Sequence, residues 1–392
     1  MKSRLRAVKL LLLASAALFA VIDYLPAALP GGQVAGMAQE EKYKPDLPPA
    51  IPADLWEMLI PEDNPMTEAK VALGRDLYFD KRLSVDNTVS CSTCHDPKTA
   101  FAEPKAVAEG IGGKKGARNS PTVLNAMFNV EQFWDGRAKS LEEQAKGPLI
   151  NPIEMGMPSH DAVVERVKQI PEYVKKFQEA FGGPITIDNI VKAIACFERT
   201  QLSGDSPFDR FIAGDKSAIS EQAQRGFELF KGKARCITCH EFNPSSPFFT
   251  DFKYHNIGVG MKATKNFESL ARQVRQMAQD NKLTAEALDQ LSLSEGFSEL
   301  GRFLVTREPK DVGAFKTPPL RDIELTAPYM HDGSLKTLRE VIEFYNKGGE
   351  PNPNLDGGIR KLDLTEQEMS DLEAFLKTLT SDRIRKLQSR KS

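Results

Sequence analysis

The chain has 392 residues, of which 41% are hydrophobic and 27% charged, a composition typical of a soluble globular protein with room for two domains. Its formal net charge is −2 at pH 7, and neither half carries a dense run of lysine and arginine. Nucleic-acid-binding proteins depend on such positive surfaces, so the sequence predicts that nucleic acid is not a partner.

The first 38 residues have the pattern of an export signal. A positive stretch, MKSRLRAVK, precedes about thirteen apolar residues at 10–22, and small residues follow up to Ala38. A membrane span needs about 20 apolar residues, so the pattern favours a cleaved signal peptide, with an uncleaved N-terminal membrane anchor as the alternative. In either case we expect the rest of the chain to be periplasmic.

Two CxxCH motifs lie far apart in the chain. The first, VSCSTCH, ends at His95, and the second, ARCITCH, ends at His240. At this spacing the two cysteines can form thioethers with the vinyl groups of one haem, and the histidine then becomes a ligand of its iron. The sequence therefore predicts two covalently bound c-type haems, attached through Cys91, Cys94, Cys236 and Cys239.

Other uses of these cysteines explain less of the pattern. Disulfides are the usual reading in an exported protein, but neither they nor a thioredoxin-type motif require the adjacent histidines. A zinc site would need four ligands of its own. The fifth cysteine, Cys196, has no partner left and is predicted to be a buried core thiol.

The surroundings of the two motifs are also repeated. An amphipathic helix is predicted before each motif, at 69–84 and at 222–234. A second helical pattern follows each motif at a distance, at 187–204 and at 364–382. Strand-like alternation is scarce, so the sequence predicts a mainly α protein.

This repeat predicts two tandem cytochrome c-like domains, each holding one haem. We expect the N-terminal domain over residues 50–205 and the C-terminal domain over 206–385, joined near 203–215. A helical insertion is predicted at 265–297, and the sequence assigns it no function.

Two segments resemble the bacterial di-haem cytochrome c peroxidase family, which includes the MauG-type enzymes. They are GARNSPTVLNAMFNVEQFWDGRAKSLEEQAKGPLINPIEMG (116–156) and TAPYMHDGSLKTLREVIEFYNKGG (326–349), and the similarity runs from about residue 50 to 380. The resemblance implies a peroxidatic haem bound by His95 and an electron-transfer haem bound by His240. It also implies a calcium ion between the domains.

The resemblance assigns roles to residues around the first haem. Glu154, in NPIEMG, matches the catalytic acid/base, and Gln144 and Pro148 match positions of the distal pocket. A carboxylate suits this place because cleavage of peroxide requires a proton to move between its two oxygens. Trp134 matches the tryptophan between the haems. Without the flanking motifs, Glu154 would be interpreted as a surface carboxylate and Trp134 as a core residue.

The calcium site is carried over in the same way. Asn119, Thr326 and Pro328 match its ligands, the last two through their backbone carbonyls. Oxygen donors are what a hard cation prefers. The sequence alone does not indicate calcium, since the region lacks a dense group of carboxylates.

The chain departs from many peroxidases of this family at the first haem. Those proteins carry a histidine that caps the peroxidatic iron until the other haem is reduced. The corresponding stretch here, AEGIGGKKGARNSP, contains no histidine. We therefore expect the first haem to be open in the oxidised protein, with no need for reductive activation.

A second departure concerns the cap of the second haem. The typical methionine is replaced here by Tyr345, which lies fourteen residues after His331, and MauG also uses a tyrosine. A phenolate stabilises ferric and higher oxidation states, whereas a thioether favours ferrous iron. Met330 is the rival ligand, and core packing is the alternative role for Tyr345. Only three histidines lie outside the CxxCH motifs, which disfavours bis-histidine ligation of both haems.

Three functions compete on these observations. The first is a periplasmic peroxidase that reduces hydrogen peroxide to water with electrons from a small c-type cytochrome or cupredoxin. The second is a MauG-like oxidase that modifies residues of a partner protein through a high-valent iron state. The third is a plain electron-transfer cytochrome, which the Glu154 motif fits poorly. The peroxidase is ranked first. Many family members form homodimers, but the sequence has no independent sign of one.

Overall fold

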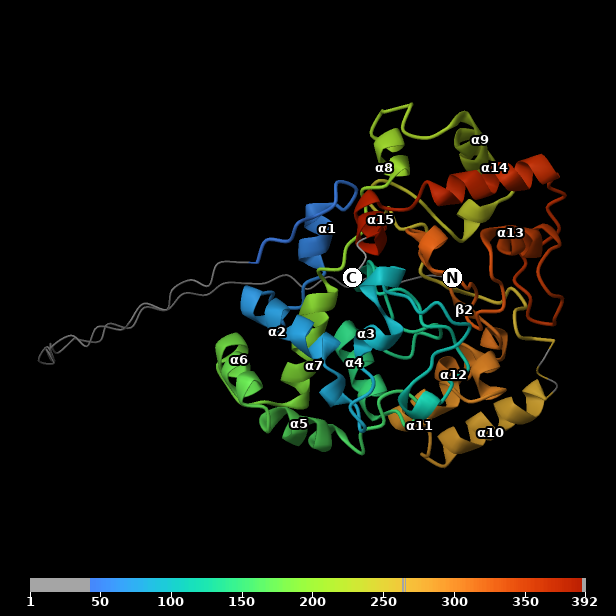
Figure 1. Ribbon diagram of the computed structural model, residues 1–392. Helices are drawn as coiled ribbons and strands as arrows, with labels where there is room; N and C mark the ends of the chain where they lie inside the picture. Colours follow the sequence, from blue (N-terminus) through green and yellow to red (C-terminus); the bar gives the residue numbers. More distant parts are fainter. Residues whose placement is uncertain (1–42, 263, 265, 390–392) are drawn as a thin grey trace, which may run out of the picture. The chain divides into compact units, whose positions relative to one another are not determined.

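Helices provide nearly all of the regular structure over residues 43–262, 264 and 266–389, the part of the chain that the computed structural model describes (Figure 1). The export signal or anchor predicted at 1–38 lies outside these residues. Within them, no helix is long and apolar enough to cross a membrane.

The α-helices within the described residues are α1 (Ala53–Met58), α2 (Glu68–Phe79), α3 (Cys91–Cys94), α4 (Leu141–Ile150), α5 (His160–Lys168), α6 (Pro171–Phe181), α7 (Ile187–Glu198), α8 (Pro207–Ile212), α9 (Glu221–Lys231), α10 (Phe267–Gln279), α11 (Ala285–Ser292), α12 (Phe303–Thr306), α13 (Leu338–Asn346), α14 (Glu366–Lys377) and α15 (Asp382–Ser389). Short 3-10 helices join them at η1 (Lys81–Leu83), η2 (Pro97–Thr99), η3 (Ile111–Gly113), η4 (Ala126–Phe128), η5 (Cys236–Thr238), η6 (Phe297–Leu300), η7 (Pro309–Asp311) and η8 (Ile323–Leu325). Two short strands, β1 (Tyr254–His255) and β2 (Phe315–Lys316), pair in antiparallel fashion. The predicted mainly α fold is confirmed.

Each half of the chain contains a pair of helices whose backbones meet at a glycine. Helix α2 packs against α7, and α9 packs against α14. A Cβ atom on Gly74 would lie 1.8 Å from the carbonyl oxygen of Ala193, and one on Gly226 would lie 1.9 Å from that of Asp371. Glycine is therefore the residue that lets each pair approach so closely. The helices predicted before and after each CxxCH motif are confirmed as α2, α7, α9 and α14.

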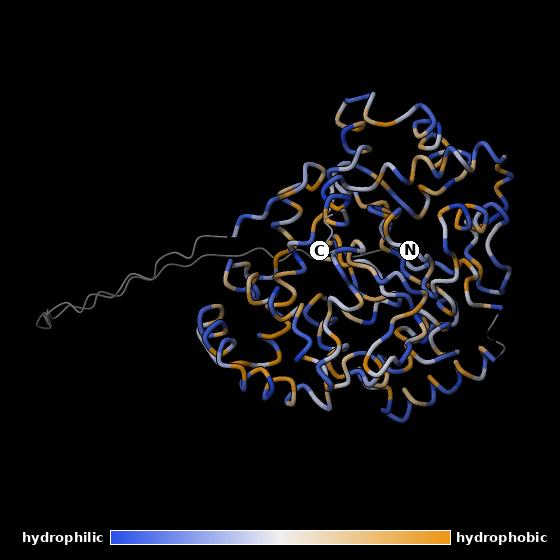
Figure 2. Tube along the Cα trace, in the orientation of Figure 1, coloured by the Kyte–Doolittle hydropathy of each residue, from blue (hydrophilic) through white to orange (hydrophobic). Residues whose placement is uncertain are grey.

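Two large hydrophobic clusters lie around these helix pairs. The first includes Leu77, Tyr78, Phe177 and Ile194, and the second is rich in phenylalanine from α8, α9 and α14. Polar and apolar residues alternate along the peripheral helices, as expected where one face packs inward (Figure 2). The domain limits at 50–205 and 206–385 stay a prediction.

The segment 265–297 forms helices α10 and α11, as predicted for its described residues. Together with η6 and α12 they enclose a small core of their own that includes Val274, Leu300 and Phe303. Figure 1 shows α10, α11 and α12 grouped together. The described residues of this segment are thus folded around a hydrophobic cluster of their own.

Candidate active site

One cavity is lined by residues of both large hydrophobic clusters, among them Leu149 and Ile194 from the first and Phe230 and Ile342 from the second. Every site residue predicted from the sequence lies in this lining. These residues are Cys91, Cys94, His95, Asn119, Trp134, Gln144, Pro148, Glu154, Cys236, Cys239, His240, Thr326, Pro328 and Tyr345. The fold therefore gathers residues that are more than 250 positions apart in the chain around one space.

The first CxxCH motif forms a single helical turn, α3, with His95 directly after it. The backbone N–H of His95 donates to the carbonyl oxygen of Cys91 at 3.0 Å. Its side-chain Nδ1 lies 3.2 Å from the carbonyl oxygen of Phe101, which leaves Nε2 as the nitrogen available to an iron. Burial lowers the pKa of His95, so the imidazole is neutral at pH 7, the form that binds metal.

The second motif repeats this geometry. The backbone N–H of His240 donates to the carbonyl oxygen of Cys236 at 2.8 Å, and its Nδ1 lies 2.9 Å from the carbonyl oxygen of Phe249. Phe101 and Phe249 share a left-handed backbone, with φ of 57° and 58°. The two loops therefore orient their histidines with the same hydrogen bond, a likeness that extends beyond the CxxCH letters.

The state of the cysteines fits haem attachment. All five are free thiols, and none forms a disulfide within the described residues. The four motif cysteines line the cavity. Cys196 lies in α7 with no exposed surface, which confirms the predicted buried thiol. Free cysteines, a neutral histidine beside each pair and a mostly apolar lining are what two covalently attached haems require.

Glu154 lies in the lining near the first motif. It follows α4, the helix that carries Gln144 and Pro148. Its backbone carbonyl accepts a hydrogen bond from the N–H of Ile111 at 2.9 Å. Burial raises the pKa of Glu154 to about 7, the positive charge of Arg137 opposes this rise, and the negative charge of Asp289 adds to it. A carboxyl group with a pKa near neutrality can both accept and release a proton at pH 7.

The stretch without a histidine, AEGIGGKKGARNSP, packs directly against the Glu154 turn. A Cβ atom on Gly110 would lie 2.0 Å from the carbonyl oxygen of Ile153 and 2.5 Å from that of Glu154. Gly112 and Gly113 have positive φ values of 60° and 71° and form the tip of the loop. The glycines thus allow close approach and a tight turn beside Glu154.

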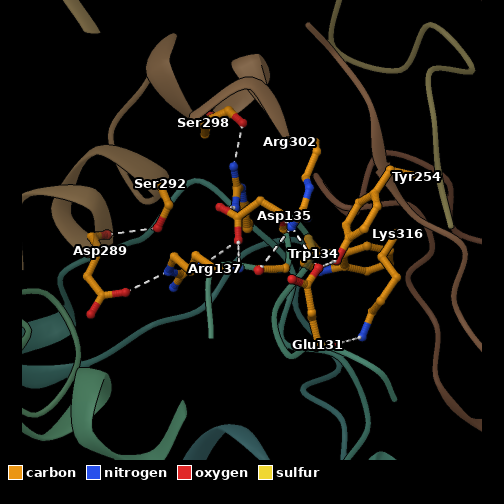
Figure 3. A network of polar contacts seen from close by, with 12 residues as sticks. Glu131, Trp134, Asp135, Arg137, Tyr254, Asp289, Ser292, Ser298, Arg302 and Lys316 are labelled. Carbon is orange, nitrogen blue, oxygen red and sulfur yellow. Dashed lines mark hydrogen bonds and ion pairs between the residues drawn. The ribbon is translucent and has the colours of Figure 1, made fainter. Parts of the chain in front are cut away.

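A buried network of charges that was not predicted from the sequence lies next to Trp134 (Figure 3). Asp135 has no exposed surface and pairs with Arg118 at 2.6 Å and with Arg137 at 3.1 Å. Arg137 also pairs with Asp289 at 2.6 Å. Arg118 and Arg137 are within the motif that carried the family resemblance, which was the available signal. Asp289 had none, because it is 152 residues from its partner.

Trp134 is held from both sides. Its indole N–H donates to the carbonyl oxygen of Asn119 at 2.9 Å, and its own carbonyl accepts from the backbone N–H of Lys316 at 2.8 Å. Its ring lies edge-on to His331, with centroids 6.5 Å apart, and His331 stacks on Phe315 at 3.6 Å. Trp134, from the first half of the chain, therefore lies against a stacked pair of rings from the second half.

Tyr345 and Met330, the two rival caps of the second haem, both line the cavity. Tyr345 is on α13, and burial raises the pKa of its phenol. No described residue forms a hydrogen bond with its hydroxyl group. Buried tyrosines normally bond their hydroxyl, so an unbonded one that borders a cavity suits a ligand-binding role.

The three remaining histidines are engaged elsewhere. His255 has a carboxylate oxygen at each ring nitrogen, from Asp251 at 2.9 Å and from Asp356 at 2.6 Å. Nε2 of His331 lies 2.8 Å from Glu299, and that of His160 lies 3.0 Å from a backbone carbonyl. None of these arrangements leaves Nε2 free to bind an iron.

The predicted calcium ligands also border this cavity. The side-chain amide of Asn119 donates to the carbonyl oxygen of Lys105 at 2.9 Å, which leaves its Oδ1 as an acceptor. The carbonyl oxygens of Thr326 and Pro328 accept no hydrogen bond from any described residue. Unused oxygen atoms of this kind fit a hard cation.

Comparison with known proteins gives the same assignment. A family described as di-haem cytochrome c peroxidase matches residues 68–217. The methylamine utilization protein MauG of Methylorubrum extorquens is 41% identical over 324 residues, 82% of this chain and 81% of that protein. A cytochrome-c peroxidase of Denitromonas iodatirespirans is 39% identical over 324 residues, 82% of this chain and 84% of that protein.

A solved structure of a MauG-like protein associated with microbial copper homeostasis is 34% identical, with a TM-score of 0.70. The likeness covers 89% of this chain and 98% of that one. The relatives thus include both peroxidases and MauG proteins. The chain belongs to the di-haem cytochrome c peroxidase family, mainly α-helical enzymes with two cytochrome c-like domains that act on peroxide.

Proposed function

We propose that this protein is a periplasmic di-haem peroxidase that reduces hydrogen peroxide to water without reductive activation. Its electrons come from a small c-type cytochrome or cupredoxin. The observation that carries the proposal is Glu154, which lines the cavity next to the first CxxCH loop and whose pKa is raised by desolvation to about 7. An electron-transfer cytochrome has no use for such a group.

The residues of the first pocket have different roles in the proposed reaction. Cys91, Cys94 and His95 would hold one haem, and the two haems, when bound, would together supply the two electrons needed to convert one peroxide and two protons to two waters. Glu154 in its ionised form accepts the proton of the inner peroxide oxygen and returns it to the outer oxygen, which leaves as water. Arg137 keeps positive charge beside this carboxylate.

Activity in the oxidised state is supported by the histidine count. The chain has five histidines, two of them in CxxCH motifs, and the other three have Nε2 bonded elsewhere. The loop that carries the capping histidine in many relatives is a glycine hairpin here. We infer that no histidine of this chain caps the first haem in the oxidised protein.

A stopped-flow experiment on the fully ferric protein tests this function. One equivalent of hydrogen peroxide is added, followed by a reduced small c-type cytochrome. We expect a fast reaction with peroxide and then rapid oxidation of the cytochrome. A ferric protein that reacts only after one haem has been reduced would contradict the open first haem.

A MauG-like oxidase that modifies a partner protein is the second candidate. Tyr345 favours it, because its hydroxyl group borders the cavity without a hydrogen bond to a described residue. In the stopped-flow experiment this function gives a long-lived oxidised state that does not react with the cytochrome. Such a result would replace the first proposal.

Tyr345 as cap of the second haem leads to a prediction. Because a thioether favours ferrous iron more than a phenolate does, Tyr345→Met is expected to raise the reduction potential of the second haem. The measurement is a spectroelectrochemical titration of both haems. Met330→Leu is the matched control, since it removes the rival ligand, and its potentials should equal those of the unmodified protein. A shift in Met330→Leu with none in Tyr345→Met would assign the cap to Met330.

We also propose that Asn119, Thr326 and Pro328 bind calcium. Trp134 donates to the carbonyl of Asn119, so loss of the ion is expected to disturb the segment that joins the two haem sites. Treatment with a calcium chelator should remove most of the peroxidase activity and quench or shift the Trp134 fluorescence. Addition of Ca²⁺, but not Mg²⁺, should restore both. Full activity in protein shown by elemental analysis to be free of calcium would refute the site.

A further inference from the structure

The segment 265–297 lies against the pocket of Glu154 through helix α11 and the turn after it. Leu293 lines the cavity, and its Cδ2 atom would be 3.4 Å from a Cβ on Gly116. The carboxylate of Asp289 rests on α4, where a Cβ on Gly147 would be 2.7 Å from its Oδ2. Gly147 lies directly before Pro148 of the distal pocket. The segment therefore touches both the glycine hairpin and the helix that border this pocket.

Arg137 is the side chain through which the segment reaches the site. It is 5% exposed and lines the cavity. Its Nε donates to Asp289 at 2.6 Å, and its Nη1 donates to Asp135 at 3.1 Å. Its guanidinium lies 3.4 Å from the ring centroid of Phe133. Two carboxylates and one aromatic face thus restrict the group, and its Nη2 forms none of these bonds.

Asp135 and Asp289 differ in their position in the chain and in their other ion-pair partners. Asp135 is two residues before Arg137 and also pairs with the buried Arg118. Asp289 comes from the distant segment and pairs with Arg137 alone among the described residues. Figure 3 shows Asp289 and Asp135 approaching Arg137 from different elements. Asp289 is therefore the contact that segment 265–297 adds to an arginine already near the site.

We propose that Asp289 is a positioning residue that fixes the Arg137 guanidinium beside Glu154, so that segment 265–297 supplies part of the pocket where peroxide reacts. The inference rests on the proposed function of this pocket and adds a structural origin for its positive charge. Arg137 lies at the cavity where anionic ligands and the peroxide oxygens would be bound, and a fixed cation there stabilises negative charge without reorganisation.

The charge of Asp289 has a second effect, on Glu154. The charged groups that act on Glu154 are Arg137, which lowers its pKa, and Asp289, which raises it. Asp289→Asn keeps an oxygen that can accept the Nε–H bond but removes the negative charge. The pH at which the rate of the peroxide reaction falls on acidification should therefore be lower in this variant. This shift reports the charge of Asp289 on Glu154, whereas the position of Arg137 is tested by ligand affinity and hydrogen exchange.

The test uses the ferric holoprotein and fluoride, an anion that binds ferric haem and accepts hydrogen bonds. Fluoride affinity is measured from the absorbance change. Asp289→Ala is expected to raise the Kd about tenfold, and Asp289→Asn should largely rescue it. Asp280→Ala is the control, because Asp280 ends α10 in the same segment and bonds only with Gln276 and Lys282 among the described residues. Its Kd should be unchanged.

Hydrogen exchange of residues 133–137 in the same variants provides a readout that needs no ligand. Faster exchange there in Asp289→Ala, with no change in Asp280→Ala, supports the proposal. Unchanged exchange together with an unchanged Kd overturns it. If the unmodified protein binds no fluoride, the open first haem of the proposed function fails, and the exchange of 133–137 alone decides the role of Asp289. If Asp289→Ala does not fold, Asp289→Ser, whose side chain is also too short to keep the contact with Arg137, replaces it in both measurements.

Discussion

Replacing Glu154 with glutamine is expected to lower the rate of peroxide turnover by about 100- to 10,000-fold, the range that a positioned acid/base contributes. Glutamine has the same shape but can neither accept nor return the proton. Both haem absorption spectra should stay unchanged, since Glu154 does not belong to either CxxCH loop. Single-turnover reduction of hydrogen peroxide is the measurement.

The pH dependence of the unmodified protein belongs to the same prediction. Burial raises the pKa of Glu154 from the ordinary value for a glutamate to about 7. The base form is therefore lost as the pH falls through about 7, and the rate should fall with it. In Glu154→Gln the remaining rate should not show this fall at low pH. Glu165→Gln, a change of an exposed carboxylate on α5, is the control and should keep both the rate and its fall at low pH. A Glu154→Gln enzyme with normal turnover would refute the acid/base role.

Replacing Gly74 with alanine is expected to destabilise the protein by about 3 kcal/mol or more, because the added methyl group overlaps the backbone of α7. A Cβ at this place would be 1.8 Å from a carbonyl oxygen. Neither helix can yield without opening the crossing of α2 and α7. Chemical denaturation followed by circular dichroism measures the loss, and Gly226→Ala should behave alike at the crossing of α9 and α14.

Gly183→Ala is the matched control for both glycines. Its nearest neighbour to an added Cβ is a carbonyl oxygen at 3.8 Å, an ordinary van der Waals contact. Its stability should stay within about 0.5 kcal/mol of the unmodified protein. Equal stability of Gly74→Ala and Gly183→Ala would mean that the two helices separate without cost, contrary to the close backbone contact described above.

Much of this structure followed from local patterns in the chain. The CxxCH motifs carry their own chemistry, because thioether attachment needs two cysteines and a histidine at short spacing. The helices of both halves follow from apolar residues at helical spacing, and the burial of Cys196 follows from its apolar face. Resemblance to the family motifs added Glu154 and Trp134 as candidate site residues. Their spacing alone would not have distinguished them from surface and core residues.

Other features needed the fold itself. The left-handed backbone of Phe101 and Phe249, which presents a carbonyl to each histidine, has no sequence signal of its own. The pKa of Glu154 depends on burial and on charges from Arg137 and Asp289, and burial is a property of the assembled cavity. The role of segment 265–297 could not be predicted, since its contact with Arg137 spans 152 residues.

The sequence by itself thus indicated the cofactor class, the helical repeat and the residues proposed to attach two haems. All of these depend on residue types a few positions apart, where the chain's own geometry sets the distance. The tertiary structure decided which side chains face one cavity, which histidines are engaged elsewhere and how the pKa of Glu154 is set. Those properties depend on distances between segments far apart in the chain, and only packing brings such segments together.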